Sequence, residues 1–118
     1  MAGSLPISII ETPEFLSAAR KLISEDNRAL LVDYLAYHPT AGDLISGTGG
    51  VRKLRWSLEG RGKRGGARVV YFYHDVGMPV FLLTAYAKNE RADLSQQDRN
   101  DFRQLTALLV KSFKRKKS

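Results

Sequence analysis

Residues 51–58, with the sequence VRKLRWSL, alternate between apolar and cationic side chains, and this alternation constrains the fold more than any other segment. The apolar set is Leu54, Trp56 and Leu58, and the other set is Lys53, Arg55 and Ser57. Successive side chains of a strand point to opposite faces of its sheet, so the pattern predicts one buried face and one cationic face. Because like charges repel and add nothing to a core, the cationic face must meet solvent or a polyanion.

The other segments predict an α+β fold, a small and mostly antiparallel sheet with an N-terminal helical hairpin and a C-terminal helix, in the order βααβββα. Strands are expected at residues 5–11, 51–58, 67–74 and 80–87. Helices are expected to open at Thr12-Pro13-Glu14 and at Ser95-Gln96-Gln97-Asp98. Residues 24–27 are expected to separate the first helix from a second, which carries Leu30, Leu31 and Leu35 and should stop at His38 because Pro39 follows.

This order places the helices against one face of the sheet, with Lys53 and Arg55 on the opposite face. Tyr34, Trp56 and Phe102 fall at apolar positions of their elements. We therefore expect all three in the core and not as stacking platforms for a ligand.

The net charge of +7 is concentrated in two segments. Residues 52–68 hold seven cations and one acid, and residues 111–118 hold five cations and no acid, which leaves the rest of the chain at −4. Concentrated positive charge on a folded domain favours a polyanion, with nucleic acid first and an anionic membrane surface second. The C-terminal run is expected to be a solvated helix end with nonspecific attraction to RNA at most.

Length and composition limit the remaining possibilities. A chain of 118 residues fits one domain, expected over residues 1–118. The absence of Cys excludes disulfides, thiolate zinc sites and a cysteine nucleophile, and it fits the cytoplasm. His38 and His74 are too few for a histidine metal site, so no metal or other cofactor is expected. No signal peptide or membrane-spanning segment is expected.

The segments GTGGVRKLRWSLEGRGKRGGARVVYFYHD and FLLTAYAKNERADLS contain the patterns GTGG-x-RK, GKRGG-x-R and KNE. In this combination the chain resembles the HigB branch of the RelE/ParE toxin superfamily, over nearly its whole length and most specifically from Gly42 to Ser95. The resemblance implies a RelE-like fold and the toxin of a type II toxin–antitoxin system. It further implies an endoribonuclease that cleaves mRNA on the translating ribosome, and a cognate HigA-like antitoxin with a helix-turn-helix DNA-binding domain.

The same resemblance assigns catalytic roles to basic residues of the central strands. Lys53 and Arg55 match a basic pair, Arg68 matches the arginine after the glycine loop, and Lys88 falls in the stretch after the last strand. The RNA-binding candidates are Arg52, Arg61, Lys63, Arg64, Tyr86 and Asn89. Asn89 stands where many relatives have arginine, and residues 93–95 lack the tyrosine that several relatives carry near this position, which leaves the general acid open.

RNA cleavage without a metal needs a base for the 2′-hydroxyl, positive charge for the phosphorane, and an acid for the leaving 5′-oxygen. Arg55 and Arg68 suit the phosphate, because a guanidinium stays charged and grips it in two places. A lysine becomes a usable base where neighbouring cations disfavour its charged form, so Lys53 is the first candidate and Lys88 the alternative. The loop at residues 60–66 either approaches RNA or only aids solubility.

Two other functions stay open. A ParE-like toxin on the same fold would inhibit a topoisomerase by protein contact and would need no catalytic cations. A nonenzymatic RNA-binding module would tolerate exchanges of Arg for Lys that a bidentate transition-state contact would not. The cationic strand face favours the endoribonuclease over the first of these.

Overall fold

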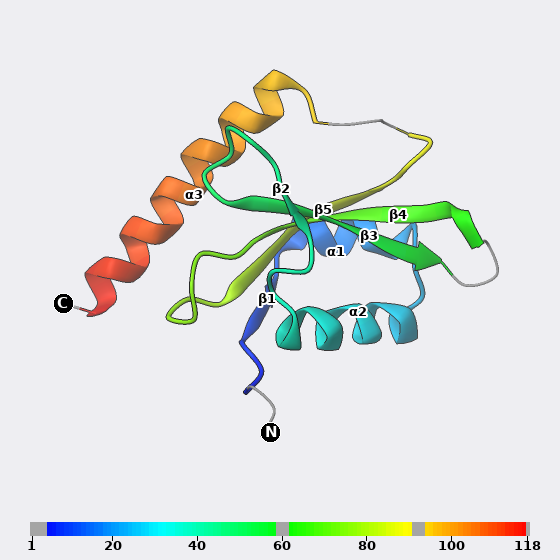
Figure 1. Cartoon of the computed structure of the whole chain (residues 1–118), viewed down its shortest axis with the longest axis horizontal. Helices are drawn as coiled ribbons and strands as arrows, with labels where there is room; N and C mark the ends of the chain where they lie inside the picture. The colour runs from blue at the N-terminus through cyan, green and yellow to red at the C-terminus, as the bar shows by residue number, and fades with distance from the viewer. Residues whose placement is uncertain (1–4, 59–61, 91–93, 118) are drawn as a thin grey trace.

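The computed structural model describes residues 5–58, 62–90 and 94–117, which form five strands and three helices (Figure 1). The elements are β1 (Ile9–Glu11), α1 (Pro13–Arg20), α2 (Glu25–Tyr37), β2 (Asp43–Leu44), β3 (Val51–Leu58), β4 (Gly62–Phe72), β5 (Val80–Ala87) and α3 (Gln96–Lys117). The α+β class is confirmed. The short strand β2 was not expected, and β1 is shorter than expected, because the chain before it contacts α2 through a hydrogen bond from Ile7 N to Ala36 O (2.9 Å).

The five strands form one sheet in the order β1-β5-β4-β3-β2. The pairings among β2, β3, β4 and β5 are antiparallel, and β1 pairs with β5 in parallel. The prediction of a mostly antiparallel sheet is therefore confirmed. β1 and β5 are not joined by a hairpin, because the chain passes through α1, α2, β2, β3 and β4 between them. This long connection allows the two strands to pair in parallel.

Short polar side chains fix where the helices begin. Thr12 Oγ1 accepts the Phe15 N–H (3.2 Å) at the start of α1, and Ser24 Oγ accepts the Asn27 N–H (3.1 Å) at the start of α2. At the start of α3, Ser95 Oγ accepts the Asp98 N–H (3.0 Å) while the Asp98 carboxylate accepts the Ser95 N–H (3.1 Å). Such contacts satisfy N–H groups that have no partner within a helix. The predicted openings of α1 and α3 are confirmed, whereas α2 begins at Glu25, inside the segment expected to separate the first two helices.

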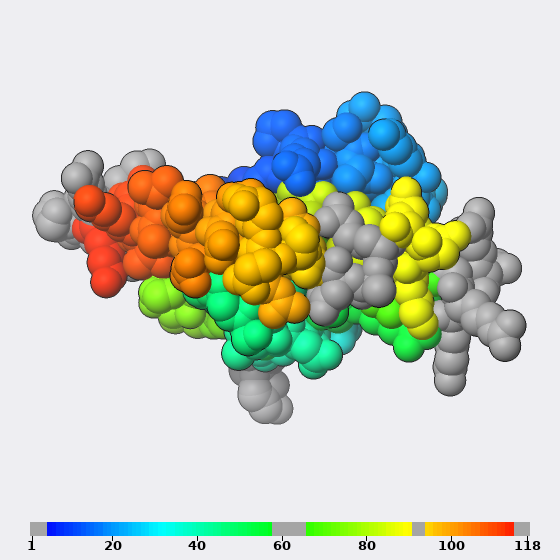
Figure 2. Space-filling model, turned by 90° about the horizontal axis from the view of Figure 1, so that it is seen from above, coloured from blue at the N-terminus to red at the C-terminus, as the bar shows by residue number. Residues whose placement is uncertain are grey.

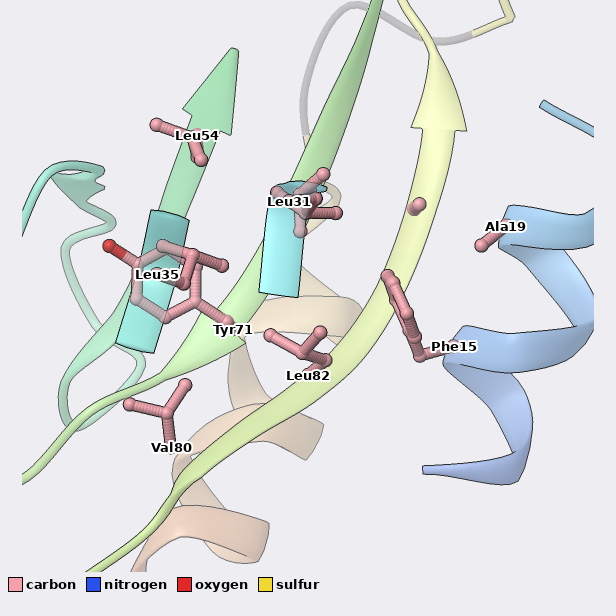
Figure 3. Close-up of a cluster of buried hydrophobic side chains, with 10 residues drawn as sticks. Phe15, Ala19, Leu31, Leu35, Leu54, Tyr71, Val80 and Leu82 are labelled. Carbon is pink, nitrogen blue, oxygen red and sulfur yellow. The ribbon is translucent and has the colours of Figure 1, made fainter. Parts of the chain in front are cut away.

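One face of the sheet packs against α1 and α2 (Figure 3). Phe15 and Ala19 of α1 and Leu31 and Leu35 of α2 are fully buried against strand residues that include Leu54, Tyr71 and Leu82. Burying such side chains contributes about 1.5–3 kcal/mol each for the larger ones. This packing explains why Leu54 and Trp56, which share one face of β3, are apolar.

The opposite face packs against α3, which corrects the expectation that all helices cover one face. Phe102, Leu109, Val110 and Phe113 of α3 lie against a second apolar cluster. The buried strand residues of that cluster include Val51, Val70, Phe72, Phe81 and Leu83. The cationic alternation of β3 therefore extends over only part of its face, because Val51, at the beginning of the strand, offers α3 an apolar surface. Figure 1 shows α3 across the sheet from α1 and α2.

The three aromatic residues expected in the core differ in their environments. Trp56 is half-buried against the first cluster, and its Nε1–H donates to Asn27 Oδ1 (3.1 Å). Phe102 is half-buried against the second cluster. Tyr34 is 40% exposed and lies against the rings of Trp56 and His38, so the expectation is wrong for this residue.

A buried polar contact fastens α3 to the segment before β3. Thr106 Oγ1 lies 3.0 Å from Thr48 O, and Thr48 Oγ1 donates to Ile45 O (2.7 Å) and accepts the Val51 N–H (3.1 Å). Gly49 has a φ of 79°, and a Cβ at this position would lie 2.4 Å from Thr106 Oγ1. The close approach of helix and loop therefore requires glycine at position 49.

Tyr71 joins the sheet to the loop before β2. Its hydroxyl accepts the Gly42 N–H (2.8 Å) and donates to Pro39 O (2.8 Å). We predict that Tyr71→Phe lowers the free energy of unfolding by about 1–3 kcal/mol, because the buried Gly42 N–H loses its partner. Tyr73→Phe is the matched control in urea denaturation. Equal stability of the two variants would contradict the assignment.

Burial raises the pKa of Tyr71 above its usual value, and the folded state therefore holds the phenolic proton more tightly than the unfolded state. The contribution of Tyr71 to stability should be complete below about pH 10 and should fall as the pH rises above it.

Candidate functional site

Arg55, Arg68 and Tyr86 lie opposite one another on three adjacent strands. Arg55 of β3 pairs with Arg68 of β4, which pairs in turn with Tyr86 of β5. Directly opposed side chains of neighbouring strands share a face of the sheet. The register therefore brings together two arginines that are separated by thirteen positions along the chain.

The two lysine candidates lie on either side of this row. Lys53 precedes Arg55 by two residues and lies in the row of Val70 on the same face. Lys88 lies in the turn after β5, where its backbone N–H donates to Gly66 O (3.4 Å). Rows two residues apart along a strand are about 6.6 Å apart. The structure thus places Lys53, Arg55 and Arg68 on one face, with Lys88 in the turn beside Gly66.

This part of the face is open because the helices cover other regions. Arg55 and Lys88 are exposed, and Lys53 and Arg68 are half-buried. The apolar cluster under α3 includes Val70 and Tyr86 but none of these four cations. We call Lys53, Arg55, Arg68 and Lys88 the cationic face.

Arg68 is held in an unusual way, because its Nη1 is buried and has no hydrogen-bond partner among the described residues. A buried guanidinium N–H without a partner is costly, since the group has lost its water without a replacement. An anion with oxygen acceptors would supply that partner and would gain a charge-assisted hydrogen bond. Arg52 Nε is also buried without a partner, but Arg68 Nη1 lies beside Arg55 on the open part of the sheet. The unsatisfied Nη1 therefore indicates an anion site at this position.

Gly66 lies beside both arginines, and the sequence did not single it out. A Cβ at this position would lie 3.8 Å from Arg68 Nη1 and 3.9 Å from Arg55 Cγ, which are ordinary contacts, and 3.3 Å from Trp56 O, which is a tight one. The glycine run was visible in the sequence, but only the strand pairing shows which of its members lies next to the two arginines.

Glu90, the acidic residue closest in sequence to Lys88, forms hydrogen bonds with the backbone of Ala87. Glu90 Oε1 accepts the Ala87 N–H (2.9 Å), and the Glu90 N–H donates to Ala87 O (3.0 Å), so the residue closes the turn after β5.

Three of the six RNA-binding candidates occupy other environments. Arg52 points away from the cationic face, and its Nη1 donates to Gly42 O (2.8 Å) and Thr40 O (3.2 Å), which gives it a structural role. Tyr86 is 4% exposed and belongs to the cluster under α3. Asn89 is exposed in the turn after β5 and lines a separate hollow with Lys21.

The other three RNA-binding candidates stay predictions. Arg61 lies outside the described residues, and only the backbone of Lys63 and Arg64 is described, within β4.

The two histidines are not part of the cationic face. His38 caps the end of α2, and His74 follows β4 with its Nε2 3.6 Å from Asp75 Oδ2. Over residues 5–58, 62–90 and 94–117, no three His, Cys, Asp or Glu side chains are grouped in a way that could hold a metal ion.

The comparisons with known proteins agree with this fold. Residues 12–117 match the family described as "RelE toxin of RelE / RelB toxin-antitoxin system". The chain belongs to the RelE toxin family. A solved structure of the E. coli toxin RelE in the free state, a mutant with two arginines replaced by alanine, is similar with a TM-score of 0.52 and 18% sequence identity. The match covers 74% of this chain and 88% of that one, and it supports the RelE-like fold.

The family membership accords with the elements described above. None of the helices in the described part of this RelE toxin is long and apolar enough to cross a membrane.

We predict that Arg68→Ala lowers the rate of RNA cleavage by about 10²-fold or more, the loss typical of removing one preorganised transition-state donor. Arg68→Lys should stay impaired, because a point charge does not replace two directed donors. Thermal stability should be kept or raised, because the substitution removes a buried group that has no partner. Cleavage rate at saturating substrate and melting temperature are the measurements.

Arg20→Ala, at an exposed cation in the last turn of α1, is the matched control for this substitution. Normal cleavage by Arg68→Ala at saturating substrate would reduce Arg68 to a binding residue. A large fall in its melting temperature would make the role structural.

Proposed function

We propose that this RelE-family toxin is a metal-independent endoribonuclease that cleaves mRNA on the translating ribosome and so inhibits translation. The observation that carries the proposal is the buried, unpartnered Nη1 of Arg68 beside Arg55 on an open face of the sheet. A phosphate of the RNA backbone provides the acceptors that this nitrogen lacks.

The chemistry requires no group beyond those of the protein and the RNA. The 2′-hydroxyl attacks the adjacent phosphorus, its proton passes to a base, and the bond from phosphorus to the 5′-oxygen breaks as that oxygen takes up a proton. Negative charge builds up on the phosphorane, where Arg68 and Arg55 stabilise it. The products are a 2′,3′-cyclic phosphate and a 5′-hydroxyl.

The positions of the lysines suit an in-line reaction, in which attacking and leaving oxygens lie on opposite sides of the phosphorus. Lys53 lies in the row on one side of the Arg55–Arg68 row, and on the other side the backbone of Lys88, in the turn after β5, contacts Gly66. We assign Lys53 to the attacking oxygen as base and Lys88 to the side of the leaving oxygen, and the reverse assignment is the alternative.

Membership in the family implies an antitoxin partner. We propose that this partner is HigA-like, with a helix-turn-helix DNA-binding domain, and that the toxin acts in the cytoplasm, where mRNA is translated. A charged toxin surface would make association with the antitoxin fast and sensitive to salt.

Induction of the chain in cells without an antitoxin should stop growth and produce cuts inside translated messages, which mapping of mRNA ends would detect. The reason is that an RNA phosphate supplies the hydrogen-bond acceptor that Arg68 Nη1 on the cationic face lacks. An Arg68→Ala chain induced to the same level is the control. Growth arrest with intact messages and trapped topoisomerase cleavage complexes would support the ParE-like function instead.

Chelation of divalent metals should leave cleavage intact in an assay that does not depend on ribosome integrity, because Lys and Arg supply both the charge and the proton transfers. The products should end in a 2′,3′-cyclic phosphate or its opened form, which mass spectrometry distinguishes. Activity that disappears with EDTA and returns only with added magnesium would contradict this mechanism. RNA that binds tightly but stays uncut would support the nonenzymatic module.

A further inference from the structure

Tyr34 carries a large ring that the packing of the core does not explain. It is 40% exposed on α2, although Leu31 and Leu35 of the same helix are fully buried. Its ring centre lies 5.8 Å from that of Trp56 on β3 and 4.7 Å from that of His38. The ring is therefore held among other rings and still offers part of its surface to a ligand.

A hollow of about 260 Å³ lies between this ring and β3. Its lining residues are Tyr34, Leu54, Arg55, Trp56 and Ser57. We call this hollow the aromatic recess. Its volume is below the range of about 300–1,000 Å³ that is usual for pockets of drug-sized ligands, so it suits a single planar ring system.

The aromatic recess is preformed because α2 holds both of its rings. Trp56 Nε1 donates to Asn27 Oδ1 (3.1 Å), and Asn27 is buried near the start of α2. This hydrogen bond satisfies the polar group of the indole and fixes the direction of its ring. Tyr34 comes from the same helix, seven residues or about two turns further along. A planar ligand would meet both surfaces already in position, which lowers the entropy that binding costs.

The aromatic recess is next to the cationic face, and Arg55 belongs to both. β2 pairs with β3 only at Arg52 and Lys53, so among the described residues the part of β3 that follows is paired on one side alone, with β4. No strand therefore separates Arg55 from the recess. Figure 2 looks down on α3 and shows strand residues, in green, beyond the N-terminal end of the helix, so α3 leaves this end of the sheet uncovered.

We propose that the aromatic recess binds a nucleobase of the RNA, beside the phosphate that Arg55 and Arg68 hold. This proposal rests on the endoribonuclease function proposed above and adds a base contact to it. Bases of single-stranded RNA stack on aromatic side chains and on guanidinium planes, and every base has a face that can do so. The recess supplies two aromatic rings and one guanidinium.

The shared arginine favours a nucleotide over a protein segment as the occupant. A ligand that fills the aromatic recess and also engages Arg55 needs a flat ring next to a negative charge, and RNA has this combination in every repeating unit. An apolar protein side chain would match the rings alone. None of the five lining residues is acidic, so the recess does not repel a phosphate chain.

The test uses the fluorescence of Trp56, the only tryptophan of the chain, as a direct report on the recess. The full chain is titrated with two short RNA strands in which 2′-O-methyl groups replace the attacking hydroxyls. One strand carries its bases and the other is abasic, so both present the same phosphates. Melting temperature and cleavage of unmodified mRNA on ribosomes are measured alongside.

Three variants separate the ring from its surroundings. Tyr34→Ala removes the ring, and Tyr34→Phe keeps it. Tyr37→Ala, at a tyrosine that is 48% exposed on the same helix and outside the lining, is the matched control.

We expect the wild type, Tyr34→Phe and Tyr37→Ala to bind the base-bearing strand about fivefold or more tightly than the abasic strand. Only the base-bearing strand should quench Trp56. Tyr34→Ala should lose most of this preference at an unchanged melting temperature, because the base loses one of its stacking partners.

A wild type that binds the two strands equally, or a Tyr34→Ala chain that keeps the full preference, would overturn the base site. Cleavage by the same wild-type chain would then show that the endoribonuclease function stands without it. An unchanged preference of Tyr34→Ala together with weaker binding of the antitoxin would assign the recess to a protein, which also overturns the proposal. A wild-type chain that neither binds nor cuts RNA would contradict the endoribonuclease function itself.

Discussion

The register of β4 between β3 and β5 decides which face of the sheet each side chain occupies. Arg55, Arg68 and Tyr86 oppose one another because of this register, and Leu54, Val69 and Ala85 turn to the helical hairpin for the same reason. A slip of one residue would move every side chain of β4 to the other face. Both apolar clusters and the cationic face depend on this single alignment, which the two clusters in turn enforce.

Along the strands, one end of the sheet packs against α3 and stabilises the fold, and the other end carries the proposed site. At one end α3 buries Val51 and Phe72, and at the other Arg55 and Arg68 stand side by side with a glycine beside them. Placing like charges together and burying Arg68 Nη1 without a partner both cost stability. The apolar clusters offset that cost, and the proposed substrate would relieve it by supplying an anion.

The arrangement of α3 also explains why one small domain can present two separate basic surfaces. The helix buries Phe102 and Phe113 against the sheet, while its cations Arg103, Lys111 and Lys114 lie along a different side. Arg68 of the cationic face is half-buried with its Nη1 unpartnered, whereas the hollow beside α3 is lined in part by Thr106, Ala107 and Val110.

The sequence by itself determined the types of most elements, because caps, breakers and periodicity act over a few residues. Thr12 and Ser95 begin helices, His38 before Pro39 ends one, and the alternation in residues 51–58 assigns Lys53 and Arg55 to one face. The family resemblance provided the basic site residues, of which Lys53, Arg55 and Arg68 share one face. These predictions succeed because the patterns involved are local.

Only the tertiary structure decided which distant residues meet. It placed α3 on the face opposite α1 and α2, engaged Arg52 with loop carbonyls, and put Lys88 beside Gly66. Each of these depends on pairings between segments far apart in the chain, and periodicity within one segment carries no information about its partner. The surroundings of Arg68 belong to the same class, because its neighbours Arg55 and Tyr86 come from two other strands.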